Sequence, residues 1–198
     1  MVPANPKLKQ PLTLWRPPPL RRLRLLWQAS LTFAMVMGFS LGIFADVQSL
    51  GFTLGKTDYK TVTKQAPSLK DSGINKYSNG KMLKGMSNHF KIQGLKKTLF
   101  IFDRKDKLAV IMMTFDKNQF NTVFGYLKKK YPISIQKIPF VGNKHVVMHK
   151  DSVKIEITAP HMSFDMDIVY STDSFDKAYK RIQRLEKQQK NKREQSQF

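Results

Sequence analysis

Three histidines are the residues that could bind a metal ion. His145 and His149 lie four apart in the segment His-Val-Val-Met-His, and His161 follows. A zinc-protease helix with this spacing also needs Glu directly after the first histidine as general base, and Val146 stands there. On a strand the two rings would share a face about 13 Å apart, too far to share one metal ion. We therefore expect ordinary surface or sheet histidines and no metal site.

Two carboxylates are the residues that could act in acid/base catalysis. Asp165 and Asp167 alternate along one stretch and would share one face of a strand, where an acid/base pair could work. The chain has no cysteine, and it lacks a glycine-framed serine, a phosphate-binding loop and a dinucleotide fingerprint. The two aspartates fit better on a solvent face beside cross-strand lysines. We expect no enzyme activity and no cofactor.

Positive charge is the strongest chemical signal. The 198 residues include 35 Lys and Arg against 14 Asp and Glu, a formal net charge of +21. After residue 46 almost all basic residues are lysine, which lacks the bidentate fork that specific reading of nucleic acid favours. Attraction to anionic lipid, lipopolysaccharide or cell-wall polymer remains, and a solvated helix face is the alternative. The densest basic set, near the C-terminus, comprises Lys177, Lys180, Arg181, Arg184, Lys187, Lys190, Lys192 and Arg193.

The first 45 residues decide where these groups would act. Residues 1–24 carry six basic side chains and six prolines, and we expect them to form a disordered basic N-terminus. Residues 25–45 are uncharged, and as a helix they would span about 30 Å, roughly the core of a bilayer. Basic residues before an apolar run stay on the cytoplasmic side, so the rest of the chain should be exported.

Two fates are open for this apolar segment. Its strongly apolar part is about Leu31 to Phe44, a length typical of a signal peptide, and Ala45 offers a small residue at the cleavage position. We expect cleavage and a periplasmic domain. The alternative is a single-span anchor in the inner membrane with the C-terminal domain in the periplasm, so membrane contact would come through residues 25–45 if they are uncleaved. A buried core helix would need one polar face, and these residues carry no charged face.

Two helices are expected within residues 47–187, which we assign to an α+β domain. The first opens with Thr57 as N-cap and ends before Pro67. The second is Lys117–Tyr131, whose apolar residues recur on one stripe of 3.6-residue period. Asp116 should cap its start through its side chain.

A third helix and a set of strands complete the domain. The last helix begins at Ser174 and dissolves into a polar basic tail over residues 188–198. Alternation of apolar and polar residues, as in Val153, Ile155 and Ile157, is typical of a half-buried antiparallel sheet. Strands are expected at Ile74–Met86 as a hairpin around Asn79-Gly80, and at Leu99–Phe102, Leu108–Phe115, Ile138–Val141, His145–His149, Val153–Ile157 and Met162–Tyr170.

The element order predicts an α+β fold: an antiparallel sheet with helices packed on one face, after an N-terminal signal or anchor helix. A strand runs into a capped helix three times, at Thr53–Tyr59, Thr114–Phe120 and Tyr170–Phe175. A duplicated α-β-β unit would explain this recurrence. The general form of strand-to-helix junctions would also explain it, and both explanations stay open.

One segment carries a resemblance to a known family. Gly51-Phe-Thr-Leu-Gly-Lys-Thr57 follows the export signal and precedes a helix and an antiparallel sheet. In this the chain resembles small exported bacterial domains that share the fold of the beta-lactamase inhibitor protein and of the small lipoprotein of the outer-membrane barrel-assembly machinery. The resemblance covers about a third of the chain and implies a binding or scaffold module. The chain lacks the lipidated cysteine of the lipoprotein members.

The sequence therefore predicts an exported, non-enzymatic envelope protein that acts as a protein-binding or scaffold module. Its partner would be another envelope protein of unknown identity. The alternative is a cationic binder of anionic lipid, lipopolysaccharide or cell-wall polymer that uses the C-terminal helix and tail. Specific nucleic-acid binding is not expected.

Overall fold

A computed structural model describes residues 46–86 and 89–197. The apolar segment over residues 25–45, expected to be a signal peptide or anchor, lies outside these ranges. Within them, no helix is both long and apolar enough to cross a bilayer.

In the described chain the helices are separated by groups of strands. The helices are α2 (Tyr59–Gln65), the 3-10 helix η3 (Lys117–Gln119), α3 (Phe120–Lys128) and α4 (Asp173–Gln195). The strands are β1 (Gln48–Ser49), β2 (Phe52–Thr53), β3 (Lys70–Ile74), β4 (Lys81–Met86), β5 (Leu95–Phe102), β6 (Leu108–Asp116), β7 (Ile133–Lys137), β8 (Lys144–Lys150), β9 (Val153–Ala159) and β10 (Asp165–Thr172).

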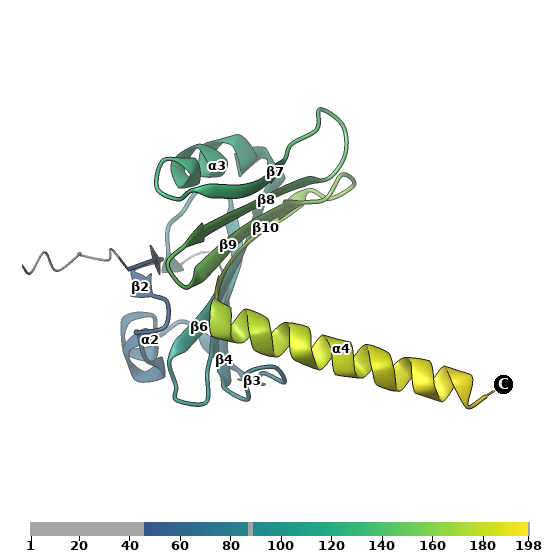
Figure 1. Ribbon diagram of the computed structural model, residues 1–198. Coiled ribbons are helices and arrows are strands. Elements are labelled where there is room, and N and C mark those ends of the chain that lie inside the picture. The colour runs from purple at the N-terminus through teal and green to yellow at the C-terminus, as the bar shows by residue number, and fades with distance from the viewer. Residues whose placement is uncertain (1–45, 87–88, 198) are drawn as a thin grey trace, which may run out of the picture. The chain divides into compact units, whose positions relative to one another are not determined.

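Eight strands form one antiparallel sheet, which confirms the predicted α+β class. Their order is β3-β4-β5-β6-β10-β9-β8-β7 (Figure 1). The first half, residues 59–116, is α2 followed by β3 to β6, and the second half, residues 117–172, is η3 and α3 followed by β7 to β10. The halves join where β6 pairs with β10, which sets Ile111 opposite Tyr170. Each half is thus one helical segment with four strands, larger than the α-β-β unit that the sequence suggested.

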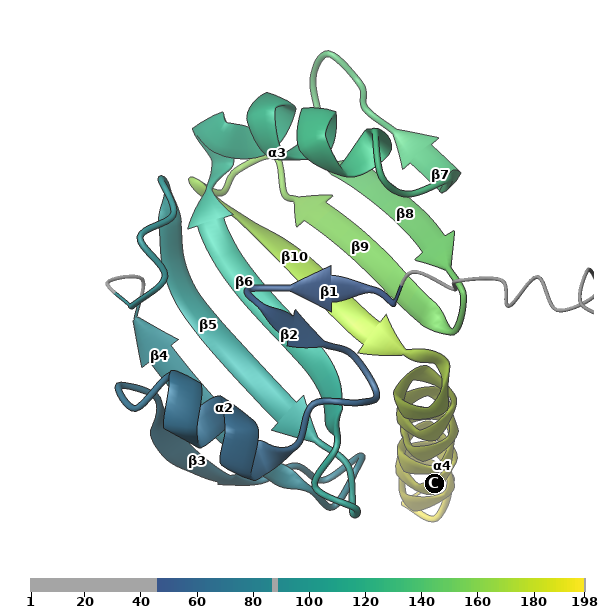
Figure 2. The same cartoon turned by 90° about the vertical axis from the view of Figure 1, so that its left-hand side faces the viewer.

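One face of the sheet is covered and holds the core. Figure 2 shows α2, α3 and the β1–β2 hairpin lying across this face. Val62 from α2 and Phe120 and Leu127 from α3 are buried there against the strands. The ring of Phe52 in β2 meets that of Phe100 edge-on, with centroids 5.6 Å apart. Each large side chain buried in this way contributes about 1.5–3 kcal/mol to folding.

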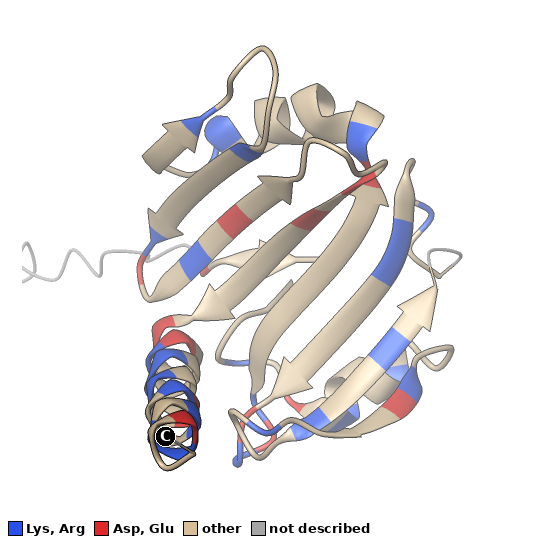
Figure 3. Ribbon diagram, turned by 90° about the vertical axis from the view of Figure 1, so that its right-hand side faces the viewer, with Lys and Arg blue, Asp and Glu red and all other residues tan. Residues whose placement is uncertain are grey.

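Helix α4 lies on the other side of the sheet. Figures 1 and 3 show it leaving the end of β10 and running away from the uncovered face. The expectation that the helices pack on one face is therefore wrong for α4. Thr172 caps its start by accepting a hydrogen bond from the backbone N–H of Phe175. The helix continues to Gln195, so most of the polar stretch expected over residues 188–198 is helical, with basic side chains at the negative end of the helix dipole.

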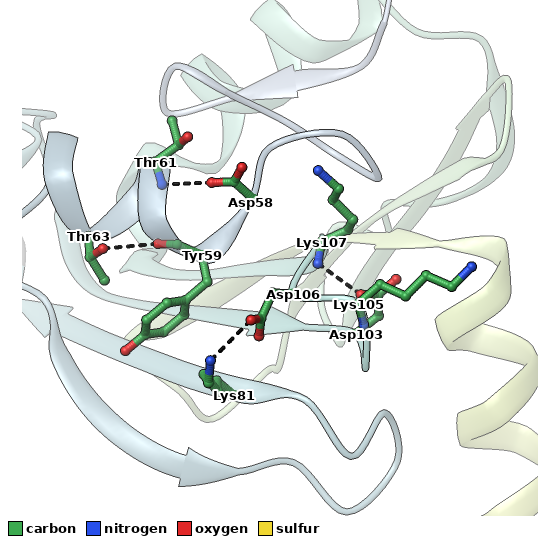
Figure 4. Close-up of polar contacts among 9 residues, drawn as sticks. All are labelled: Asp58, Tyr59, Thr61, Thr63, Lys81, Asp103, Lys105, Asp106 and Lys107. Atoms are coloured by element: carbon green, nitrogen blue, oxygen red, sulfur yellow. Dashed lines mark hydrogen bonds and ion pairs between the residues drawn. The ribbon is translucent and has the colours of Figure 1, made fainter.

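The residues that start the first two helices differ from those predicted. Asp58, and not Thr57, caps α2, because its Oδ1 accepts the backbone N–H of Thr61 at 2.8 Å (Figure 4). This hydrogen bond lowers the pKa of Asp58. The Thr57 hydroxyl instead accepts a backbone N–H from β2 at 2.9 Å. Asp116 makes no side-chain cap, and its carboxylate lies 2.6 Å from the Lys96 ammonium.

The start of α2 is fastened to the β5–β6 turn, residues 103–107. Tyr59 donates its backbone N–H to the Asp106 carbonyl at 2.9 Å. Lys81 donates to the Asp106 carboxylate at 3.1 Å, and its ammonium lies 4.6 Å from the centroid of the Tyr59 ring (Figure 4). Asp103 accepts two backbone N–H groups of the same turn at 2.8 Å each.

The hairpin expected around Asn79-Gly80 is confirmed as β3 and β4. Its loop covers residues 75–80 and is longer than a two-residue turn. Asn79 takes a positive φ of 52°. Gly80 is required for a different reason, because a Cβ there would lie 1.9 Å from the Phe102 carbonyl oxygen.

Two elements of the second half are displaced from their predicted positions. The helix expected over Lys117–Tyr131 begins as η3 and ends at Lys128. The strand expected at Ile138–Val141 is wrong, because β7 precedes it and residues 138–143 form a loop. All five residues of β7 are exposed. The alternation Ile133-Ser-Ile135-Gln at the start of β7 does indicate a strand, but it spans four residues, the shortest run that carries this signal.

Candidate binding surface on the open face of the sheet

The face of the sheet turned away from α2 and α3 is here called the open face (Figure 3). In each strand every second side chain points to it. Two rows of side chains cross β4, β5 and β6 on this face, namely Lys84, Leu99 and Met112, and Met86, Lys97 and Thr114.

These rows line a depression of about 620 Å³ on the first half, here called the lysine-rimmed depression. Its floor is apolar, with Leu99 and Met112 half-buried and Met86 64% exposed. Methionine side chains are unbranched and polarisable, so they can adapt to an irregular partner. The depression can accept apolar side chains from another molecule.

Three lysines surround this floor. Lys70 and Lys84 are direct cross-strand partners, and Lys97 lies diagonally across from Lys84. Like charges directly opposite one another in a sheet destabilise the pair. Within the part of the chain that the structure describes, none of the three forms an ion pair. The depression therefore joins an apolar floor to uncompensated positive charge.

The open face of the second half carries a network of paired side chains around Lys154 and Glu156. His145 Nε2 lies 2.8 Å from Glu156 Oε1. The Lys154 ammonium lies 3.0 Å from Glu156 Oε2 and 2.8 Å from Asp176 Oδ2 in α4. Burial alone would raise the pKa of Glu156, but hydrogen bonds from His145 and Lys154 outweigh it and hold that pKa below its ordinary value. Burial would likewise lower the pKa of Lys154, and its two carboxylate partners raise it instead.

The structure places the three histidines at separate points of the second half. His145 and His149 both lie on the open face of β8, opposite Thr158 and Lys154 of β9. His161 lies in the loop between β9 and β10. Across residues 46–86 and 89–197, no group of three or more His, Asp or Glu side chains is placed to hold a metal ion.

The two aspartates considered as an acid/base pair have separate partners. The Lys96 ammonium lies 2.5 Å from Asp165 Oδ1 and 2.6 Å from Asp116 Oδ1. Hydrogen bonds to Asp116 and Asp165 raise the pKa of Lys96. Asp167 accepts a hydrogen bond from the Thr114 hydroxyl at 2.8 Å. The structure thus places Asp165 beside a lysine of β5, a strand that does not pair with β10, and Asp167 beside a threonine of the paired strand β6.

The basic residues singled out in the sequence lie together on α4. All eight are exposed: Lys177, Lys180, Arg181, Arg184, Lys187, Lys190, Lys192 and Arg193. The helix is attached near its start, where the Tyr77 ring contacts Phe175 and Tyr179 with centroids 6.4 and 4.6 Å away. Lys76 pairs with Glu186 at 3.0 Å. Beyond Glu186 the one ion pair in the described helix, Lys190 to Glu194, lies within α4 itself.

A smaller cavity of about 290 Å³ lies between the start of α4 and the open face. Ile101, Val110 and Phe175 contribute apolar walls, and Ser171 forms part of its floor. Ser171 is 2% exposed, and its hydroxyl has no hydrogen-bond partner among the described residues. The cavity therefore contains an unpaired buried hydroxyl at the junction of the two halves.

Sequence reasoning did not find the lysine-rimmed depression. Its lining residues are scattered between residues 68 and 114 and come together because β4, β5 and β6 pair in one register. The available signal was the alternation Met82-Leu-Lys84-Gly-Met86, in which apolar and basic side chains share one strand face.

Comparison with family models, with curated proteins and with solved structures found no match to the chain. The resemblance to domains related to the beta-lactamase inhibitor protein therefore stays an expectation.

Proposed function

We propose that the protein is an exported, non-enzymatic binding module of the cell envelope whose open face docks a partner protein. The lysine-rimmed depression carries this proposal, because it offers an apolar floor beside three lysines without acidic partners in the described ranges. The partner presents apolar side chains flanked by Asp or Glu. Burial of one Leu or Phe there would contribute about 1.5–3 kcal/mol, and the charges would guide association.

Export is supported by the N-terminal sequence, where six basic residues precede an uncharged stretch over residues 25–45. The proposed location is the periplasm after signal cleavage, and the alternative is a single-span protein of the inner membrane. Measuring the mass of the mature N-terminus together with cell fractionation tests this. A full-length chain in the cytoplasmic fraction would contradict export.

Site-specific crosslinking tests the docking face, because the chain has no cysteine of its own. Met86→Cys places a crosslinker on the depression, and Thr122→Cys places one on the exposed side of α3. We expect a discrete protein adduct from position 86 and none from position 122. The adduct should disappear when Lys84 and Lys97 are both changed to Glu. Equal adducts from positions 86 and 122, or an adduct that survives the charge reversal, would refute the proposal.

A second function is favoured by one observation, the exposure of all eight basic residues on a helix that leaves the sheet (Figure 3). In that case α4 binds anionic lipid, lipopolysaccharide or cell-wall polymer. Truncation after Tyr179 would then abolish binding to anionic vesicles, and raising salt from low to physiological concentration would weaken it. Binding that survives the truncation would end this alternative.

A further inference from the structure

Two loops at one end of the second half carry the most exposed apolar side chains of the described chain. Phe140 is 103% exposed and Val141 66% exposed in the loop between β7 and β8. Met162 and Phe164 are each 90% exposed in the loop between β9 and β10. The two loops share one end of the sheet, because Lys144 at the start of β8 pairs with the end of β9. Large exposed apolar groups gathered in one place mark an interaction site.

These loops are held in place by polar contacts. The backbone N–H of His161 donates to Asn143 Oδ1 at 2.7 Å, which ties one loop to the other. The backbone N–H of Lys117 donates to the Phe164 carbonyl at 2.8 Å. The Lys117 ammonium donates to the carbonyl oxygens of Pro160 and His161. The backbone that carries the apolar side chains is therefore held in place by hydrogen bonds.

The charge around these loops is positive. The neighbouring acidic groups are Asp116 and Asp165, which both pair with Lys96, and Asp167, which accepts a hydrogen bond from the Thr114 hydroxyl. Three further lysines lie next to the loops. Lys137 and Lys144 flank the loop between β7 and β8, and Lys117 contacts the loop between β9 and β10. In the described part of the chain none of these three makes an ion pair.

We propose that the two loops insert into the surface of an anionic phospholipid bilayer. The side chains of Phe140, Val141, Met162 and Phe164 enter the boundary between headgroups and acyl chains, and the three lysines contact lipid phosphates. Side chains on two loop tips suit a deformable lipid surface better than a protein partner, whose interface core needs close shape complementarity. Lysines beside such apolar side chains gain electrostatic attraction to anionic headgroups.

This surface is separate from the one assigned above. The lysine-rimmed depression belongs to the first half of the sheet, whereas the two loops belong to the second half. The loops also differ from the basic set on α4. Docking of a partner on the open face and insertion of the loops are therefore independent claims.

Fluorescent labels on single cysteines in the full chain provide the test, since no native cysteine competes for the dye. An environment-sensitive dye is attached at Phe140→Cys and, in a second protein, at Met162→Cys. Control labels sit at Thr122→Cys on α3 and at Lys187→Cys on α4. Each protein is mixed with vesicles of phosphatidylglycerol and phosphatidylethanolamine, or with vesicles of phosphatidylcholine alone. Spin-labelled lipids then report whether the dye lies within the acyl region.

We expect the labels at positions 140 and 162 to shift to the blue and to be quenched by spin-labelled lipid in anionic vesicles, with a weaker response in phosphatidylcholine. The label at position 122 should not respond. The response at position 162 should be lost in Phe140→Ser with Phe164→Ser. It should persist in Ile74→Ser, which removes an apolar group 62% exposed in the first half.

Four results would overturn the proposal. The first is a response of the label at position 187, or binding of the chain to vesicles, without any response of the labels at positions 140 and 162. In that case α4 or residues 25–45 would make the membrane contact alone. The second is an equal response in both kinds of vesicle, which would remove the role of the lysines. The third is persistence of the position 162 response in the double Phe variant. The fourth is silence in all vesicles together with a protein adduct from a crosslinker at position 140, which would make the loops a protein interface.

Discussion

The two halves of the sheet share one architecture and differ on the open face. Each sets a helical segment followed by four antiparallel strands against the core. On the open face, the first half leaves Lys70 and Lys84 opposite one another without acidic partners in the described chain, whereas the second half pairs Lys154 with Glu156 and Asp176. The covered face thus specifies the fold, and the open face carries what distinguishes the halves.

The difference has an energetic meaning. Paired and partly buried charges in the second half support folding through charge-assisted hydrogen bonds. The facing lysines of the first half oppose folding by a few tenths of a kcal/mol. Under the proposed function, an anionic partner would relieve this repulsion on binding, which makes the first half the better candidate for recognition.

The largest expected effect tests whether the two halves fold as one unit. Ile111 is fully buried in β6, opposite Tyr170 of β10. Ile111→Ala should lower the free energy of unfolding by about 3–4 kcal/mol, because it removes apolar contacts and leaves a cavity. Denaturant unfolding, followed by circular dichroism, should show a single transition at lower denaturant. Ile74→Ala, at an exposed site, is the control. Two transitions, with one at its original midpoint, would show that the halves fold separately.

The fold was more predictable from sequence than the candidate site. Strong alternation in β9 and β10 marked the sheet, because one face of each central strand must be apolar. Edge strand β7 was missed, since its apolar–polar alternation spans only four residues, Ile133-Ser-Ile135-Gln. The cap of α2 was placed one residue early, because Thr57 and Asp58 are both good caps and the choice depends on contacts with the β5–β6 turn.

The candidate binding surface could not be predicted, because strand register, and not proximity in the sequence, brings its residues together. Lys70, Lys84 and Lys97 are separated by 14 and 13 positions in the sequence and meet across β3, β4 and β5. The sequence marked the contiguous basic residues on α4 instead. A local run of charge is visible in one dimension, whereas a cross-strand cluster requires the strand order and the bulge positions to be known.

The second prediction breaks the ion-pair network of the second half. Glu156→Gln should lower the free energy of unfolding by about 1.5 kcal/mol at neutral pH, because it removes charge-assisted hydrogen bonds with His145 and Lys154. The pKa of folded Glu156 lies below its ordinary value of 4.5, so the stabilisation is present above that value and is lost as pH falls through the folded pKa. The difference between wild type and variant, measured by urea unfolding from pH 7 to pH 3, should therefore shrink below pH 4.5. A difference that stays constant with pH would contradict this account.

The third prediction concerns the cavity at the junction of the halves. The Ser171 hydroxyl is buried and has no partner within the described residues. Ser171→Ala removes an unpaired polar group and should raise the free energy of unfolding by about 1 kcal/mol. Ser134→Ala, on the exposed strand β7, should change it by less than about 0.5 kcal/mol. Destabilisation by Ser171→Ala would mean that the hydroxyl has a hydrogen-bond partner, such as a bound water.

The smallest expected effect sharpens the comparison most directly. Lys84→Gln removes the repulsion from Lys70 and should raise the free energy of unfolding by about 0.2–0.5 kcal/mol, opposite in sign to Glu156→Gln. Lys105→Gln, an exposed lysine in the β5–β6 turn, serves as the control. The stability gain should be lost at high salt, because exposed charges are screened there. The same variant should weaken the adduct formed from position 86, since stability and recognition oppose one another at this residue. If Lys84→Gln is more stable and still forms the full adduct from position 86, this lysine does not contribute to binding.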